Sequence, residues 1–142
     1  MSNRRLALDA WESLFRAQHE LFNEFAVDFA CSELTQPEYD VLLTVTRGAD
    51  HTARLREITA NALISQPSVS RLVDRMVASG LLTKHADPED GRGFLLTATE
   101  DGVRRFRLVS TAHGRHIAER MAALSPEDLT LLLDLTRRLR AG

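Results

Sequence analysis

Apolar residues recur every three or four positions from Trp11 to Phe29, which predicts one long amphipathic helix. Charged residues such as Glu12 and Arg16 fall on the opposite side. A helix of this length needs a large apolar partner surface, and a chain of 142 residues has little surface to spare. We therefore expect dimerisation through this helix. The apolar stripe consists of Trp11, Leu14, Phe15, Leu21, Phe22, Phe25 and Phe29.

Two segments share a helix-start signal, in which a capping residue precedes a proline and an acidic residue. Thr35 can cap the first of these helices, and Glu38 can reach back to close a capping box. We expect this helix to span Pro37–Arg47 and to stop at a left-handed Gly48. Ser125 opens a last helix in the same way. The residues expected to face inward from that helix are Leu129, Leu132, Leu133 and Leu139.

Two short helices joined by a tight turn are predicted next. The first is defined by Leu55, Ile58, Ala62 and Leu63, and the turn around Ile64 leads to Ser65 as the next N-cap. In the second helix apolar positions repeat at helical spacing until Gly80. These apolar positions are Val69, Leu72, Val73 and Met76.

A β-hairpin follows, because Leu81–His85 and Phe94–Ala98 flank a turn rich in Pro, Asp and Gly. Thr99 then caps a long helix. We expect a mostly α fold with a small β-hairpin wing, which is a winged helix-turn-helix. The expected organisation is a single domain over 1–142, with a DNA-binding lobe at 35–99 and dimerisation helices at 1–33 and 100–142.

The second short helix and the hairpin tip carry the candidate chemistry. In a winged helix-turn-helix the second helix enters the major groove, where Gln pairs with adenine and Arg with guanine. The helix N-terminus at Ser65 offers backbone amides to a phosphate. Arg92 can enter the minor groove, and we expect Asp90 to hold its guanidinium. The candidate DNA-binding residues are Ser65, Gln66, Ser68, Ser70, Arg71, Arg75, Asp90 and Arg92.

The charge distribution agrees with a polyanionic partner. The net charge is −2, but residues 1–50 carry four arginines against nine acidic residues, whereas residues 51–86 carry five basic residues against two acidic ones. This local excess is the footprint expected for nucleic acid. The alternatives are a solvated helix surface and a winged-helix module that binds another protein. A steep salt dependence of binding would favour DNA over the protein partner.

Four stretches of the chain carry a family pattern, namely 34–42, 65–76, 80–82 and 87–102. Through them the chain resembles the MarR-type transcriptional regulators, and the resemblance extends over essentially its whole length. The resemblance implies an obligate homodimer on a pseudo-palindromic DNA operator, and repression relieved by a small, often anionic aromatic effector. Ala98 departs from the family, which usually has a larger aliphatic residue there.

An effector cleft is expected beside the first helix, where aromatic residues gather on one face. Trp11, Phe15 and His19 are its candidate lining, and Arg16 is the candidate partner of an acidic ligand. A packed dimer core explains Trp11 and Phe15 equally well, and a solvated surface explains Arg16.

Two sensing alternatives stay open. Cys31 is a candidate redox switch, although a buried structural cysteine is the favoured interpretation. His113, His116 and Glu119 are spaced to seed a metal site, although a hydrogen bond of His113 across the dimer is favoured.

We expect no metal, cofactor or catalytic site, because the sequence has no phosphate loop or nucleophile elbow. A single cysteine suggests a reducing, cytoplasmic setting, and no apolar run is long enough to span a membrane.

Overall fold

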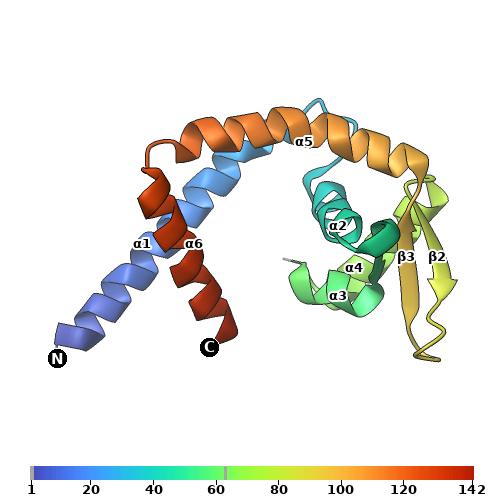
Figure 1. Ribbon diagram of the computed structural model, residues 1–142, viewed down its shortest axis with the longest axis horizontal. Coiled ribbons are helices and arrows are strands. Elements are labelled where there is room, and N and C mark those ends of the chain that lie inside the picture. The colour runs from blue at the N-terminus through green and yellow to red at the C-terminus, as the bar shows by residue number, and fades with distance from the viewer. Residues whose placement is uncertain (1, 63) are drawn as a thin grey trace.

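The computed structural model describes residues 2–62 and 64–142 of the chain. These residues form long helices and a small lobe. The elements run in the order α1 (Ser2–Phe25), η1 (Ala26–Phe29, a 3₁₀ helix), α2 (Gln36–Arg47), η2 (Ala49–His51, also 3₁₀), β1 (Thr52–Arg54), α3 (Leu55–Asn61), α4 (Gln66–Ala78), β2 (Leu82–Ala86), β3 (Phe94–Ala98), α5 (Glu100–Met121) and α6 (Pro126–Ala141). Figure 1 shows that α5 spans the molecule, with the lobe of α2, α3, α4 and the sheet near one end and α1 and α6 near the other. Leu63, expected in the first short helix, lies outside the described residues.

The predicted helix starts are confirmed. Thr35 Oγ1 accepts the backbone N–H of Glu38 at 3.3 Å, and the Glu38 carboxylate accepts the backbone N–H of Thr35 at 2.8 Å, so the capping box is complete. Ser125 Oγ likewise accepts the backbone N–H of Asp128 at 3.2 Å. Each contact satisfies an amide that the helix itself leaves unpaired.

The end of α2 differs from the prediction. Gly48 has φ −75° and ψ 160°, so it is extended and not left-handed. Glycine is needed there for a close approach, since a Cβ would lie 1.9 Å from the carbonyl oxygen of Thr52. The left-handed residues are instead Asp50 and His51, at φ 56° and 51°. Gly80, at φ 83°, does end α4 as predicted.

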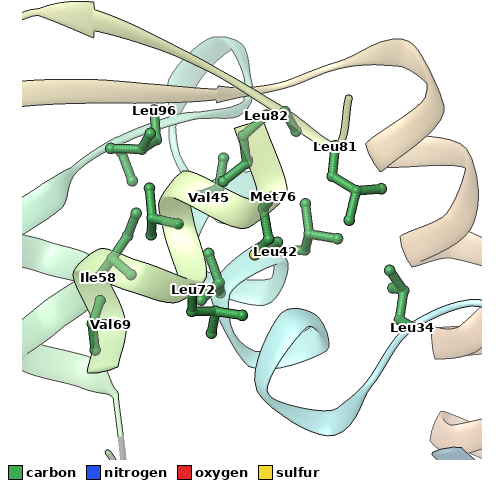
Figure 2. Packing of buried hydrophobic residues seen from close by; sticks show 14 of the residues in the cluster. Leu34, Leu42, Val45, Ile58, Val69, Leu72, Met76, Leu81, Leu82 and Leu96 are labelled. Carbon is green, nitrogen blue, oxygen red and sulfur yellow. The ribbon is translucent and has the colours of Figure 1, made fainter. Parts of the chain in front are cut away.

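The hydrophobic core lies in the lobe, and Leu34 before α2 and Val109 of α5 complete it. Val69, Val73 and Met76 of α4 are at most 1% exposed and belong to the same cluster of buried residues as Leu42 and Val45 of α2. Figure 2 shows Val69 and Met76 among these neighbours. Burying a side chain of this size contributes roughly 1.5–3 kcal/mol. The apolar face of α4 is thereby fixed inward, and its polar face must point to solvent.

A three-stranded antiparallel sheet forms the wing, in the order β1-β3-β2. The hairpin of β2 and β3 was predicted, with the first strand shifted by one residue. Strand β1 was not predicted, because three residues are too few to show an alternating pattern. The hydroxyls of Thr52 and Thr97 are 2.9 Å apart across the β1–β3 pair. Thus β3 is the central strand of the sheet, with β1 paired on one side and β2 on the other.

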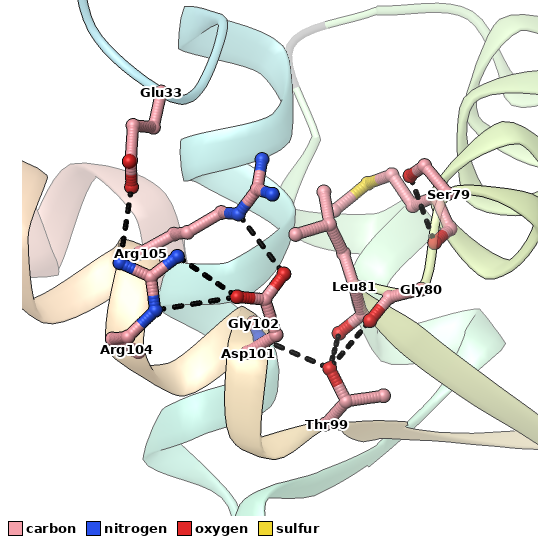
Figure 3. Close-up of polar contacts among 10 residues, drawn as sticks. Glu33, Ser79, Gly80, Leu81, Thr99, Asp101, Gly102, Arg104 and Arg105 are labelled. Atoms are coloured by element: carbon pink, nitrogen blue, oxygen red, sulfur yellow. Dashed lines mark hydrogen bonds and ion pairs between the residues drawn. The ribbon is translucent and has the colours of Figure 1, made fainter.

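Helix α5 starts against the turn that leads into the wing. The Thr99 hydroxyl donates to the carbonyl of Gly80 at 2.6 Å and accepts the backbone N–H of Gly102 at 3.0 Å (Figure 3). A Cβ on Gly102 would lie 2.3 Å from the carbonyl oxygen of Leu81, so glycine permits this approach. The position of α5 is therefore coupled directly to the wing.

Charged residues join the first turn of α5 to the segment before α2. The Asp101 carboxylate lies 2.9 Å from the Arg104 guanidinium and 3.0 Å from that of Arg105, and Arg104 also lies 3.5 Å from Glu33 (Figure 3). Hydrogen bonding to Arg104 is the largest cause that holds the pKa of Asp101 below its usual value.

The long terminal helices expose much of their apolar surface within one chain. Of the residues expected to face inward from α6, Leu129 and Leu132 are half-buried, but Leu133 is 49% and Leu139 is 69% exposed, so the prediction is wrong for these last two in the single chain. On α1, Trp11 is 60% and Phe15 is 54% exposed. The physical reason is that α1 and α6 extend away from the lobe and its core (Figure 1). Among the described residues, no helix has the length and apolar character needed to cross a bilayer.

Candidate nucleic-acid interface

The outer face of α4 is polar because its apolar face is committed to the core. Gln66, Arg71 and Arg75 are exposed, while Ser68 and Ser70 are half-buried at its edges. These are the side chains that the sequence placed outside the apolar stripe. The structure therefore brings the predicted α4 residues together on one accessible surface.

The N-terminus of α4 differs in detail from the prediction. Ser65 occupies the N-cap position, but its side chain caps no backbone amide. Its hydroxyl instead donates to Ser68 Oγ at 2.8 Å, and Ser68 Oγ also accepts from the Arg71 guanidinium at 3.3 Å. Pro67 contributes no N–H to the first turn, and the amides that remain there are uncapped by Ser65, so they point out of the helix and are available to an anion.

The expected pairing of Asp90 with the Arg92 guanidinium is wrong. Asp90 Oδ1 instead accepts the backbone N–H of Arg92 at 3.1 Å, and the Asp90 carbonyl accepts the N–H of Gly93 at 3.0 Å. An aspartate side chain is short and readily closes such a turn on an amide two residues ahead. Asp90 thus shapes the wing tip, and the Arg92 side chain stays exposed.

A groove of about 430 Å³ lies between the start of α4 and the wing. Gln66 and Ser70 line it from α4, and Asp90 and Arg92 line it from the wing tip. Four of the predicted residues, from segments at least twenty positions apart in the sequence, thus share one hollow surface. Further lining residues include Arg54 and Arg56.

The sequence reasoning missed the role of Arg54. This side chain, on β1, lies 2.8 Å from the Asp87 carboxylate and 2.7 Å from that of Glu89. Asp87 is only 4% exposed and also accepts the backbone N–H of Glu89 at 2.9 Å. That backbone hydrogen bond, with the Arg54 guanidinium, holds the pKa of Asp87 below its usual value. Arg54 therefore fastens the base of the wing, and only recognition of β1 could have revealed it.

A second ion pair ties α4 to the wing. Lys84 Nζ on β2 lies 3.2 Å from Asp74 Oδ1 on α4, and 4.2 Å from the centre of the Phe94 ring. Two of the five basic residues in 51–86 are thus engaged by carboxylates. In the described part of the chain, no carboxylate lies within ion-pair distance of the other three, which are Arg56, Arg71 and Arg75.

The four residues predicted to line an effector cleft lie on the exposed side of α1. The rings of Trp11 and Phe15 are 5.7 Å apart, Arg16 lies 3.0 Å from Glu12, and His19 lies 3.2 Å from Asn23. Their role in ligand binding stays a prediction.

A largely apolar cavity of about 310 Å³ lies elsewhere, between the lobe and the long helices. Phe22 of α1, Phe29 of η1 and His113 of α5 line one side, and Tyr39 and Asp40 of α2 are among the residues on the other. The sequence could not indicate this cavity, since its lining comes from five separate elements.

The structure changes the interpretation of the sensing candidates. Cys31 is exposed, so the expectation of a buried structural cysteine is wrong; it lies after η1, beyond the long helix that would bury it. His113 and His116 both place Nδ1 within 3.0 Å of Asp28, so the expected bond of His113 across a dimer is made within the chain. Across the described residues, no group of three or more ligating side chains is arranged to hold a metal ion.

Comparison with known sequences places this geometry among related proteins. Residues 32–93 match the MarR family. The chain is 27% identical over 111 residues to the HTH-type transcriptional regulator YdgJ from Bacillus subtilis (strain 168), over 78% of this chain and 66% of YdgJ. It spans between 58% and 66% of the length of the curated relatives it matches.

Solved structures share the whole architecture. Sco3205, a MarR family transcriptional regulator from Streptomyces coelicolor crystallised in complex with DNA, superposes with a TM-score of 0.81 at 21% identity, covering 94% of this chain and 84% of that one. PcaV, a transcriptional regulator from the same organism in complex with its natural ligand, gives a TM-score of 0.72 at 26% identity, covering 91% and 90%. The predicted fold class, mostly α with a β wing, is confirmed.

Proposed function

We propose that the chain is a MarR-type transcriptional regulator that binds double-stranded DNA, since residues 32–93 match that family and solved MarR family regulators share its fold. One observation carries the proposal: the exposed face of α4 and the wing tip line one groove, with Gln66 and Arg92 on its two sides. A recognition helix and a protruding basic ribbon fit the major groove and the neighbouring minor groove of a duplex.

The residues divide by the contact that each can make. Gln66 and Arg71 are exposed on the first two turns of α4, and they are the proposed readers of base edges. Ser65, Ser68, Ser70 and Arg75 are proposed to contact phosphates or bases from the same helix. Arg92 is proposed to enter the minor groove, and Asp90 to shape the turn that presents it.

We propose that two copies bind together. Large apolar residues of α1 and α6, among them Trp11, Phe15 and Leu139, are more than half exposed in the single chain, and a second copy would cover them. Two recognition helices about 34 Å apart would then fit successive major grooves of a pseudo-palindromic operator. Phe15→Glu should shift the protein toward monomer in analytical ultracentrifugation, whereas Glu12→Lys on the solvated side should not. An unchanged dimer in Phe15→Glu would contradict this interface.

The cavity between the lobe and the long helices supports control by a ligand. It is lined both by α2, which packs in the lobe core, and by α1 and α5. A ligand that favours a lobe spacing unsuited to the operator would release DNA, and coupling of about 1–3 kcal/mol would change affinity several- to a hundredfold. We propose that the protein acts as a repressor in the cytoplasm, relieved in this way.

Selection of bound duplexes from a random pool, followed by a salt titration, tests the function. We expect enriched palindromic sites and an affinity that falls linearly with salt on logarithmic axes. Failure to enrich any duplex, or a shallow salt response, would favour the alternative of a winged-helix module that binds another protein.

A further inference from the structure

One polar side chain inside the 310 Å³ cavity has a defined hydrogen-bonding direction. His113 lines the cavity and is 7% exposed. Its ring centre lies 4.9 Å from that of Phe29, 5.2 Å from that of Tyr39 and 5.8 Å from that of Phe25. Three aromatic rings therefore surround the imidazole and restrict how it can turn.

Asp28 decides which nitrogen of His113 carries the proton. Nδ1 of His113 lies 2.7 Å from Asp28 Oδ2, and Nδ1 of His116 lies 2.9 Å from Asp28 Oδ1. Burial acts to raise the pKa of Asp28, but the hydrogen bonds from the two histidines outweigh it and hold that pKa below its usual value. Asp28 is thus a carboxylate, which can only accept, and so Nδ1–H of His113 donates to it.

The two histidines share Asp28 through the same ring nitrogen, and the side chain of His113 is 9% exposed whereas that of His116 is 31% exposed. An imidazole that carries its proton on Nδ1 and donates it to a carboxylate has a lone pair on Nε2. No described residue donates a hydrogen bond to that nitrogen.

The charge of the cavity wall disfavours an anion. Among the described lining residues Asp40 is the charged one; it is half-buried, and this burial raises the pKa of its carboxyl. Arg16, which the sequence offered as the partner of an acidic ligand, is exposed on α1, pairs with Glu12 at 3.0 Å and does not line the cavity. A ligand carboxylate would lose water and gain no cation.

We propose that this cavity selects a neutral aromatic ligand that donates a hydrogen bond to Nε2 of His113, as an undissociated phenol does, and rejects aromatic carboxylates. A volume of about 310 Å³ fits one substituted ring. The inference replaces the anionic effector expected from the family resemblance. Its regulatory meaning rests on the proposed function, but ligand selection itself does not depend on DNA.

Three probes of similar size separate the contributions. 4-Ethylphenol offers a donor, 4-ethylanisole offers the same ring without one, and 4-ethylbenzoate carries a negative charge. We expect calorimetric titration of the full chain at neutral pH to show the phenol binding about tenfold tighter than either other probe. Equal or tighter binding of the benzoate would overturn the proposal, and so would binding of none of the three.

Two substitutions should remove the two preferences separately. His113→Phe should reduce the phenol-over-anisole ratio to about one, because the acceptor is lost. Asp40→Asn should keep that ratio and narrow the phenol-over-benzoate ratio. His85→Phe, the same change at an exposed site on β2, is the matched control and should change neither ratio. A His113→Phe variant that still prefers the phenol would overturn the role of His113. Should that variant not fold, the probe ratios of the parent protein still decide the proposal.

DNA binding is measured on the same samples without probe. A protein that binds selected duplexes but shows no phenol preference would overturn this inference and leave the proposed function intact. A protein that prefers the phenol but enriches no duplex would overturn the proposed function and leave the ligand selectivity intact.

Discussion

The sharpest test of the DNA interface is the removal of the positive charge at the wing tip. Arg92 is exposed, and in the described chain its guanidinium has no carboxylate partner, because Asp90 is engaged by the Arg92 backbone N–H. In Arg92→Gln that backbone bond is retained, so the turn should keep its shape. Only the charge offered to DNA changes.

The size of the effect follows from counterion release. Each phosphate contact contributes about 0.9 to the slope of log affinity against log salt. A homodimer presents Arg92 twice, so Arg92→Gln should reduce the slope by about 1.8. At about 0.15 M salt this loss corresponds to roughly thirtyfold weaker binding, if ion release is the whole contribution of the contact.

Fluorescence anisotropy with a labelled operator, between about 50 and 200 mM salt, measures both quantities. Arg115→Gln is the matched control, since Arg115 is exposed on α5 and lies outside the groove. We expect the control to keep the parent slope, and Arg92→Gln to weaken binding evenly across operator sequences. A slope for Arg92→Gln equal to that of Arg115→Gln would refute the placement of the wing on DNA.

Three other substitutions test different parts of the structure. Arg71→Ala should cost about 1–3 kcal/mol of operator affinity and relax one base preference, as measured by repeating the duplex selection. Gly102→Ala should lower the free energy of unfolding by about 1–3 kcal/mol, because its Cβ would meet the Leu81 carbonyl. Gly114→Ala on the same helix is the matched control: its Cβ meets nothing within 4 Å, so it should raise the free energy of unfolding by up to about 1 kcal/mol. Urea titrations measure both changes. The Asp87 carboxyl has a lowered pKa, so its contribution to folding stability is complete above its ordinary pKa and is lost as pH falls through the lowered value. Asp87→Asn should therefore lower the free energy of unfolding at pH 7. In unfolding titrations, the difference between variant and parent should shrink below about pH 4.

Local signals in the sequence determined most of the secondary structure. The capping box of Thr35 and Glu38, the caps at Thr99 and Ser125 and the left-handed Gly80 act within a few residues of chain, so their residue types alone specify them. The helical spacing of apolar residues in α4 likewise determined which of its side chains face solvent.

Contacts between distant segments decided the rest. Gly48 is extended because the carbonyl of Thr52 approaches it, and β1 exists because β3 offers it hydrogen-bonding partners. Arg54 fastens the wing only because β1 lies beside residues more than thirty positions away. The cavity and the proton position on His113 depend on Asp28, which is 85 residues earlier in the chain. A residue's own neighbours fix its local conformation, but charge pairing and cavity shape depend on which elements the fold brings together, and no local pattern records that.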